Sequence, residues 1–158
     1  MIKMRVVGVT LDPVTNVPII ILKDQKNERT LPIWIGIFEA SAIAIKLEGI
    51  QTPRPLTHDL LRTVIEILNG KVSRVVIDDL KDNVFYAKIF IKLGRKTVKI
   101  DSRPSDAIAL ALRTQSPIYI NEEVIVKMQK EEVKPSRSED VKTLLESIDL
   151  EEFGKYKM

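Results

Sequence analysis

Two short phrases of this chain combine residue types that can transfer protons and bind phosphate. The first, RPLTHDLL (54–61), contains the single histidine, His58, with Arg54 upstream and Asp59 directly after it. Histidine exchanges protons near neutral pH, arginine pairs with phosphate, and a carboxylate can orient an imidazole. The phrase predicts a proton-transfer site, or alternatively a helix start in which Thr57 is the cap and Asp59 complements the helix dipole.

The second phrase, SRPSDAIALAL (102–112), follows Asp101 and brings Arg103, Ser105 and Asp106 to another expected helix start. Asp101 and Asp106, with Glu39 from an earlier helix start, are candidate oxygen ligands for a divalent cation, Mg²⁺ or Mn²⁺. The alternative is a serine cap, Pro104 in the first turn and a salt bridge from Arg103. The spacing of these carboxylates matches no specific metal motif, so both interpretations stay open.

The elements that must position these residues are readable from periodicity and turn chemistry. Apolar residues at helical spacing predict three helices: one after Gly36, one over about 57–69 and one near 104–114. The expected buried stripe of the second helix consists of Leu60, Leu61, Val64, Ile65 and Leu68. Valine-rich or alternating runs predict strands over 4–11, 18–22, 29–35, 72–80, 84–93 and 96–101, and one or two more over PIYIN and EEVIVKM (117–128). In the run 84–93, Tyr86, Lys88 and Lys92 point to the wetter face of the sheet.

The two halves of the chain resemble each other. RVVGVTL (5–11) matches RVVIDDL (74–80), and EASAIA (39–44) matches DAIALA (106–111), in the same order. Each half then has three strands followed by a helix. Duplication predicts an α+β fold in two layers, a mixed sheet with helices packed on one side. The helix at 104–114 is apolar almost all round, so we expect the sheet or a second subunit to bury it, and a homodimer follows from the latter.

Bulk composition limits the function classes. The chain has 158 residues, no cysteine and a formal net charge of +3, which excludes disulfides and thiolate chemistry and shows no dense basic stripe. It has no secretory signal and no apolar run long enough to cross a bilayer, so we expect a cytoplasmic protein without a membrane partner. We expect one domain over 1–129, then a polar linker and short helical tail over 130–158.

Four phrases together resemble the bifunctional nuclease domain family. They are LPIWIG with Glu39 following, RPLTHDLL, LKDNVFYAKI and IDSRPSDAIALALR, and the resemblance runs from about Met4 to Met128. It implies a two-layer α+β domain with a duplicated β-α-β-β motif, often dimeric. It also implies a nuclease that acts on both DNA and RNA, an activity attributed to plant members. By motif position it indicates the site residues Glu39, Arg54, His58, Asp59, Asp101, Arg103 and Asp106.

The residues and the resemblance together give two function hypotheses. In the first, the protein hydrolyses phosphodiester bonds, with His58 as acid or base, Arg54 and Arg103 on the phosphate, and a divalent ion on the carboxylates. In the second, it is a non-catalytic dimeric domain that binds a small anionic ligand or a partner protein. The first hypothesis requires the helix starts to converge in space.

Overall fold

The computed structural model describes residues 1–131, which form one mixed sheet with four helices. The described strands lie in the order β3-β2-β1-β7-β4-β5-β6. The strands are β1 (Ile2–Leu11), β2 (Pro18–Asp24), β3 (Thr30–Trp34), β4 (Gly70–Lys81), β5 (Val84–Leu93), β6 (Lys96–Ser102) and β7 (Ile118–Ile120). The helices are α1 (Ile37–Leu47), α2 (Thr57–Ile67), α3 (Pro104–Thr114) and α4 (Glu122–Lys130).

The sheet consists of two antiparallel meanders joined by one short strand. β1, β2 and β3 form the first, and β4, β5 and β6 form the second. β7 lies between them, antiparallel to β1 and parallel to β4. Each meander is followed by a helix, so the order of elements predicted from the repeat is confirmed. Counted from the first strand, each half is β-β-β-α, and this replaces the β-α-β-β order that the family resemblance implied.

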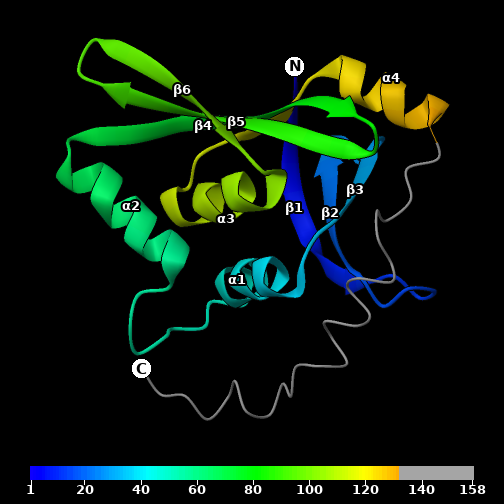
Figure 1. Cartoon of the computed structure of the whole chain (residues 1–158), viewed down its shortest axis with the longest axis horizontal. Helices are drawn as coiled ribbons and strands as arrows, with labels where there is room; N and C mark the ends of the chain where they lie inside the picture. Colours follow the sequence, from blue (N-terminus) through cyan, green and yellow to red (C-terminus); the bar gives the residue numbers. More distant parts are fainter. Residues whose placement is uncertain (132–158) are drawn as a thin grey trace.

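The helix α3 is the centre of the core. Residues 107–111 of this helix are almost completely buried, and Ile108 and Leu110 have no exposed surface. α3 packs against β4 and β5 on one side and against α1 and α2 on the other (Figure 1). The chain therefore buries α3 by itself, and that helix requires no second subunit.

The last described helix, α4, replaces a predicted strand. The segment EEVIVKM was expected to extend the sheet, but only Ile118–Ile120 does so, as β7. Asn121 begins α4, Glu122 and Glu123 lie in its first turn, and Lys127 and Lys130 lie in its last turn. This charge order stabilises a helix, and it outweighs the β-branched residues that suggested a strand. Whereas α1, α2 and α3 pack on one side of the sheet as predicted, α4 lies on the other side of the β4–β5 hairpin (Figure 1).

The apolar stripe of α2 is largely exposed, against prediction. Ile65 is partly buried against the core, but Ile67 is 72% and Leu68 68% exposed, and Leu60, Leu61 and Val64 are exposed as well. Periodicity shows that a face is apolar, but it does not show what covers that face.

None of the helices in residues 1–131 is long and apolar enough to span a membrane. The predicted tail lies beyond the described residues.

Candidate functional site

The first turns of α1, α2 and α3 meet and are joined by one chain of polar contacts. His58 Nε2 of α2 lies 3.0 Å from Asp106 Oδ1 of α3. Arg103, which directly precedes α3, donates from Nε to Asp106 Oδ2 at 2.9 Å and from Nη1 to Glu39 Oε1 of α1 at 2.8 Å. The predicted convergence of helix starts therefore holds for four residues, which we call the helix-start network: Glu39, His58, Arg103 and Asp106.

Local sequence explains why these side chains are presented here. Pro104 is the first residue of α3, where its missing N–H has no helical partner to lose. Arg103 precedes that proline in extended backbone, which directs it away from the helix axis and toward α1. Acidic residues lie in the first turn of all three helices, where the partial positive charge of the helix ends stabilises them.

His58 is buried, with 8% of its surface exposed, and its two ring nitrogens have different surroundings. Because an ionised carboxylate can only accept, Nε2 must carry the proton that it shares with Asp106. Nδ1 is buried and has no hydrogen-bond partner among the described residues. Nδ1 is therefore the nitrogen that is left to exchange a proton.

Asp106 is ionised at neutral pH in this arrangement. Burial would raise the pKa of Asp106, but the hydrogen bonds from Arg103 and His58 outweigh that effect and hold the pKa below its usual value. The same contact with Asp106, followed by the contact with Glu39, raises the pKa of Arg103. The network thus contains two carboxyl groups, one guanidinium and one imidazole.

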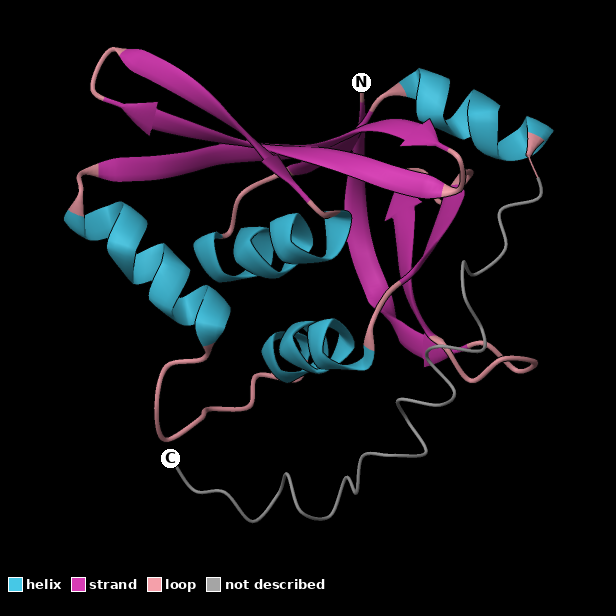
Figure 2. Cartoon of the chain, viewed as in Figure 1, coloured by secondary structure: helices cyan, strands magenta, loops and turns pink. Residues whose placement is uncertain are grey.

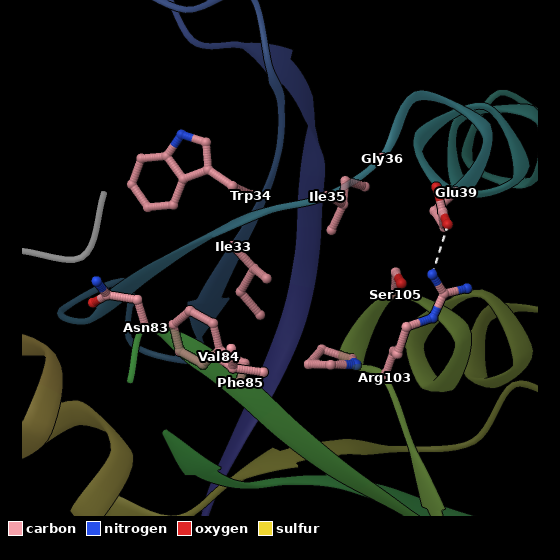
Figure 3. Close-up of a pocket in the computed structure, with 11 residues that line it drawn as sticks. Ile33, Trp34, Ile35, Gly36, Glu39, Asn83, Val84, Phe85, Arg103 and Ser105 are labelled. Carbon is pink, nitrogen blue, oxygen red and sulfur yellow. Dashed lines mark hydrogen bonds and ion pairs between the residues drawn. The ribbon is translucent and has the colours of Figure 1, made fainter. Parts of the chain in front are cut away.

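The network borders two open cavities. The first has a volume of about 350 Å³, and its wall includes all four residues of the network together with Phe38. The second has a volume of about 220 Å³ and lies between Trp34, Phe85 and the Arg103–Glu39 pair. Figure 3 shows this second cavity, with Arg103 reaching from the start of α3 to Glu39 on α1. Because Glu39 and Arg103 line both cavities, their ion pair is a shared wall.

Gly36 leaves the space in which Glu39 reaches Arg103. A Cβ atom at position 36 would stand 2.2 Å from Glu39 Oε2, which is closer than any real contact. We expect Gly36→Ala to displace the Glu39 carboxylate and lengthen its contact with Arg103, while the backbone, at φ −73°, tolerates alanine. A crystal structure of the variant would show the displacement, and an unmoved Glu39 would contradict it. Gly8→Ala, where nothing lies within 4 Å, is the matched control.

Asp59 and Arg54 do not join the network, although they flank His58 in the sequence. Asp59 accepts from the Leu56 backbone N–H at 2.9 Å and from Arg113 Nε at 2.8 Å. Burial would raise the pKa of Asp59, but these two hydrogen bonds lower it. Arg54 lines a separate cavity of about 380 Å³ together with Asp59 and Arg113.

Arg113 is a structural residue that sequence reasoning missed. It is only 3% exposed, and it donates to Asp59, to the Ala109 carbonyl and to the Ala42 carbonyl. It therefore ties α3 to both α1 and α2. A signal existed in the sequence: an arginine directly follows the apolar run 107–112, and a buried arginine requires partners.

The predicted metal ligands do not form a cluster. Asp101 is ion-paired with Lys88 on β5, whereas Glu39 and Asp106 share Arg103. Within residues 1–131 no group of three or more histidine or acidic side chains is placed to hold a metal ion. A divalent cation on Glu39 and Asp106 would have to displace the guanidinium between them. As arranged, these residues therefore do not fit a divalent metal ion, and the requirement of the protein for such an ion stays a prediction.

Comparison with known proteins adds a family and several relatives. A model of the bifunctional nuclease domain matches residues 20–133, a span that includes every residue of the network. An uncharacterized protein of Mycobacterium tuberculosis is 38% identical over 155 residues, which cover 98% of this chain and 92% of that protein. Bifunctional nuclease 1 of Oryza sativa subsp. indica is 26% identical over 124 residues, which cover 77% of this chain but 38% of the plant protein. Bifunctional nuclease 1 of Arabidopsis thaliana is 27% identical over 108 residues, which cover 66% of this chain and 33% of the plant protein.

Proposed function

Because this chain belongs to the bifunctional nuclease domain family, we propose that it hydrolyses phosphodiester bonds of DNA or RNA at the helix-start network. The observation that supports this site is the contact of His58 with Asp106, at 3.0 Å, beside an arginine and a cavity of about 350 Å³. An imidazole oriented by a carboxylate is a common arrangement for moving a proton in hydrolysis.

In the proposed reaction, His58 is the proton-transfer residue and Asp106 holds its ring. The oxygen of a water molecule bonds to phosphorus, and the proton that the water loses goes to Nδ1. The P–O bond to the leaving group breaks, the departing oxygen takes up a proton from solvent, and His58 then releases the proton on Nδ1 to solvent. In the free protein Nδ1 is shielded from solvent, so this role requires that substrate binding admit water beside α2.

Arg103 is the proposed phosphate ligand. Its side chain is 64% exposed, and its two ion pairs use Nε and Nη1, so that Nη2 is left for a phosphate oxygen. Fixed guanidinium groups stabilise the charge that develops on phosphate in the transition state. Arg54, predicted from the sequence to share this role, lines the neighbouring cavity and is proposed only as a secondary contact for the substrate strand.

Cleavage of RNA and plasmid DNA by purified protein tests the proposal. We expect His58→Ala to lose about 1,000-fold in rate, the size of a general acid–base contribution. The informative control is His58→Gln, because its amide can still donate to Asp106 but cannot exchange a proton. Equal activity in His58→Gln and wild type would make His58 a positioning residue only. Assays with EDTA, then with Mg²⁺ or Mn²⁺ restored, test the predicted metal separately.

A second function is favoured by one observation. Every charged group of the network already has a partner within the chain, an arrangement that also suits a non-catalytic domain for a small anionic ligand or a partner protein. If no cleavage occurs with any divalent metal ion or at any pH, that result would support the non-catalytic function. The homodimer stays part of either proposal, supported by the exposed apolar face of α2. The cytoplasmic location likewise stays a prediction.

A further inference from the structure

The sheet carries a concentration of positive charge away from the helix-start network. Side chains of β5 alternate between its two faces: Ala87, Ile89 and Ile91 are buried, whereas Lys92 is exposed on the opposite face. The strand register places Lys71 of β4 beside Lys92, and it places Arg74 of β4 and Lys99 of β6 on either side of Phe90. These six side chains define what we call the outer sheet face: Lys71, Arg74, Tyr86, Phe90, Lys92 and Lys99.

Among the described residues, four cations of this face have no acidic partner, whereas Lys88, on the same face between Tyr86 and Phe90, is paired with Asp101. Within residues 1–131, neither Lys71, Arg74, Lys92 nor Lys99 forms an ion pair. The acidic residues of the same meander lie nearer its other end, where Asp79 and Asp101 are paired with lysines. Since the net charge of the whole chain is only +3, the four unpaired cations make this region locally far more basic than the average surface.

The register itself makes this charge unfavourable in the free protein. Lys71 and Lys92 are direct cross-strand partners, and like charges directly opposite each other destabilise a sheet. Both lysines are exposed. Figure 2 shows α2 and α3 on one side of this part of the sheet and α4 at its other end. A polyanion would relieve the repulsion that residues 1–131 leave uncompensated.

One aromatic ring, that of Phe90, lies between the cations. The guanidinium of Arg74 stacks 3.9 Å from the centre of the Phe90 ring, and its Nε is buried without a hydrogen-bond partner. Tyr86 is 38% exposed farther along the same face of β5, opposite Asp79. Stacked guanidinium planes and exposed rings accept unpaired bases, and spaced lysines follow a phosphate backbone. Aromatic groups among cations distinguish this surface from one that would attract any anion.

We propose that the outer sheet face binds the backbone of single-stranded nucleic acid. The inference rests on the proposed function, because it assigns that substrate a docking surface outside the site of cleavage. β6 begins on this face and ends at Ser102, directly before Arg103, so the strand leads from the docking surface to the network. A substrate strand that crosses the β6 edge of the sheet would reach both the outer sheet face and the helix-start network.

Fluorescence anisotropy with a labelled single-stranded RNA and a matching DNA tests the proposal. The variant combines Lys71→Gln, Lys92→Gln and Lys99→Gln; the control combines Lys3→Gln, Lys26→Gln and Lys130→Gln, which remove the same charge from exposed sites elsewhere. Loss of three phosphate contacts should lower affinity about 100-fold in 0.1 M salt and reduce the slope of log K against log salt by about 2. The control should bind as wild type does.

The outcomes separate this inference from the proposed function, because binding is measured without cleavage. Weak binding by the outer-face variant alone supports the docking surface, even if no preparation cleaves. Equal binding by the variant and its control overturns the docking surface, even if wild type cleaves. Sedimentation of both variants adds one more outcome: a change of oligomeric state in the outer-face variant, with nucleic-acid binding intact, would make this face a contact between copies and overturn the proposal.

Discussion

Asp106→Asn is expected to reduce cleavage by about 1,000-fold while leaving the fold intact. Asparagine has nearly the shape of aspartate, but it lacks the charge that orients the His58 Nε2–H and pairs with Arg103 Nε. Without that charge, the imidazole loses the preference for the tautomer that leaves Nδ1 free to take a proton. Turnover of RNA and plasmid DNA, with unfolding followed in parallel, measures the effect.

The pH dependence of this variant gives a second readout. The pKa of Asp106 is lowered in the folded protein, so the wild-type carboxylate is charged throughout the neutral range and its stabilising contacts are lost only as the pH falls through that lowered value. We therefore expect the difference in the free energy of unfolding between wild type and Asp106→Asn to persist at neutral pH and to shrink as the pH falls below about 4, which urea unfolding at each pH measures.

Two further variants make this result interpretable. Asp82→Asn lies in the β4–β5 turn, outside the network, and should cleave at the wild-type rate. Asp101→Asn discriminates between mechanisms, because Asp101 is paired with Lys88 in the structure but was a metal candidate in the sequence. A loss in Asp101→Asn as large as in Asp106→Asn would favour the predicted metal site over the arrangement proposed here. Full activity in Asp106→Asn would remove the network from the reaction.

Arg113→Met is expected to destabilise the protein by about 3 kcal/mol, the largest stability effect that we predict. Methionine retains much of the apolar stem, but it leaves the carbonyl oxygens of Ala42 and Ala109 and the Asp59 carboxylate without this donor. Unpaired buried acceptors lose the hydration that the unfolded chain gives them. Urea unfolding monitored by circular dichroism measures the change in the free energy of unfolding.

Arg62→Met is the matched control for that prediction. Arg62 forms an exposed ion pair with Glu66 four residues later on α2, and pairs of this kind contribute about 0.5 kcal/mol or less. If both substitutions have equally small effects, the contacts of Arg113 are not what holds α1 and α2 against α3. A large loss of stability in Arg113→Met alone would show that the packing of α1 and α2 against α3 depends on a residue in the last turn of α3.

Much of the secondary structure could be predicted from the sequence. The start of α3 follows from Pro104 at its first position, and the alternation in β5 identified the exposed face that carries Lys88 and Lys92. The repeat predicted the order of elements in both halves. Predictions failed where two local signals conflicted, or where an apolar face had nothing to cover it. α4 contains β-branched residues, which favour a strand, but its charge order favours a helix. The apolar stripe of α2 lacks a covering element among residues 1–131.

The sequence by itself determined which residues begin the helices, and therefore that charged groups would collect at helix starts, because capping and dipole effects act within one turn. Only the tertiary structure decided which of those groups meet. His58 and Asp59 are adjacent in the sequence, but successive residues on a helix point about 100° apart. His58 therefore contacts Asp106 at the start of α3, whereas Asp59 contacts Arg113 in the last turn of the same helix. The packing of α1, α2 and α3 against one another selects the helix-start network from the wider set of candidates.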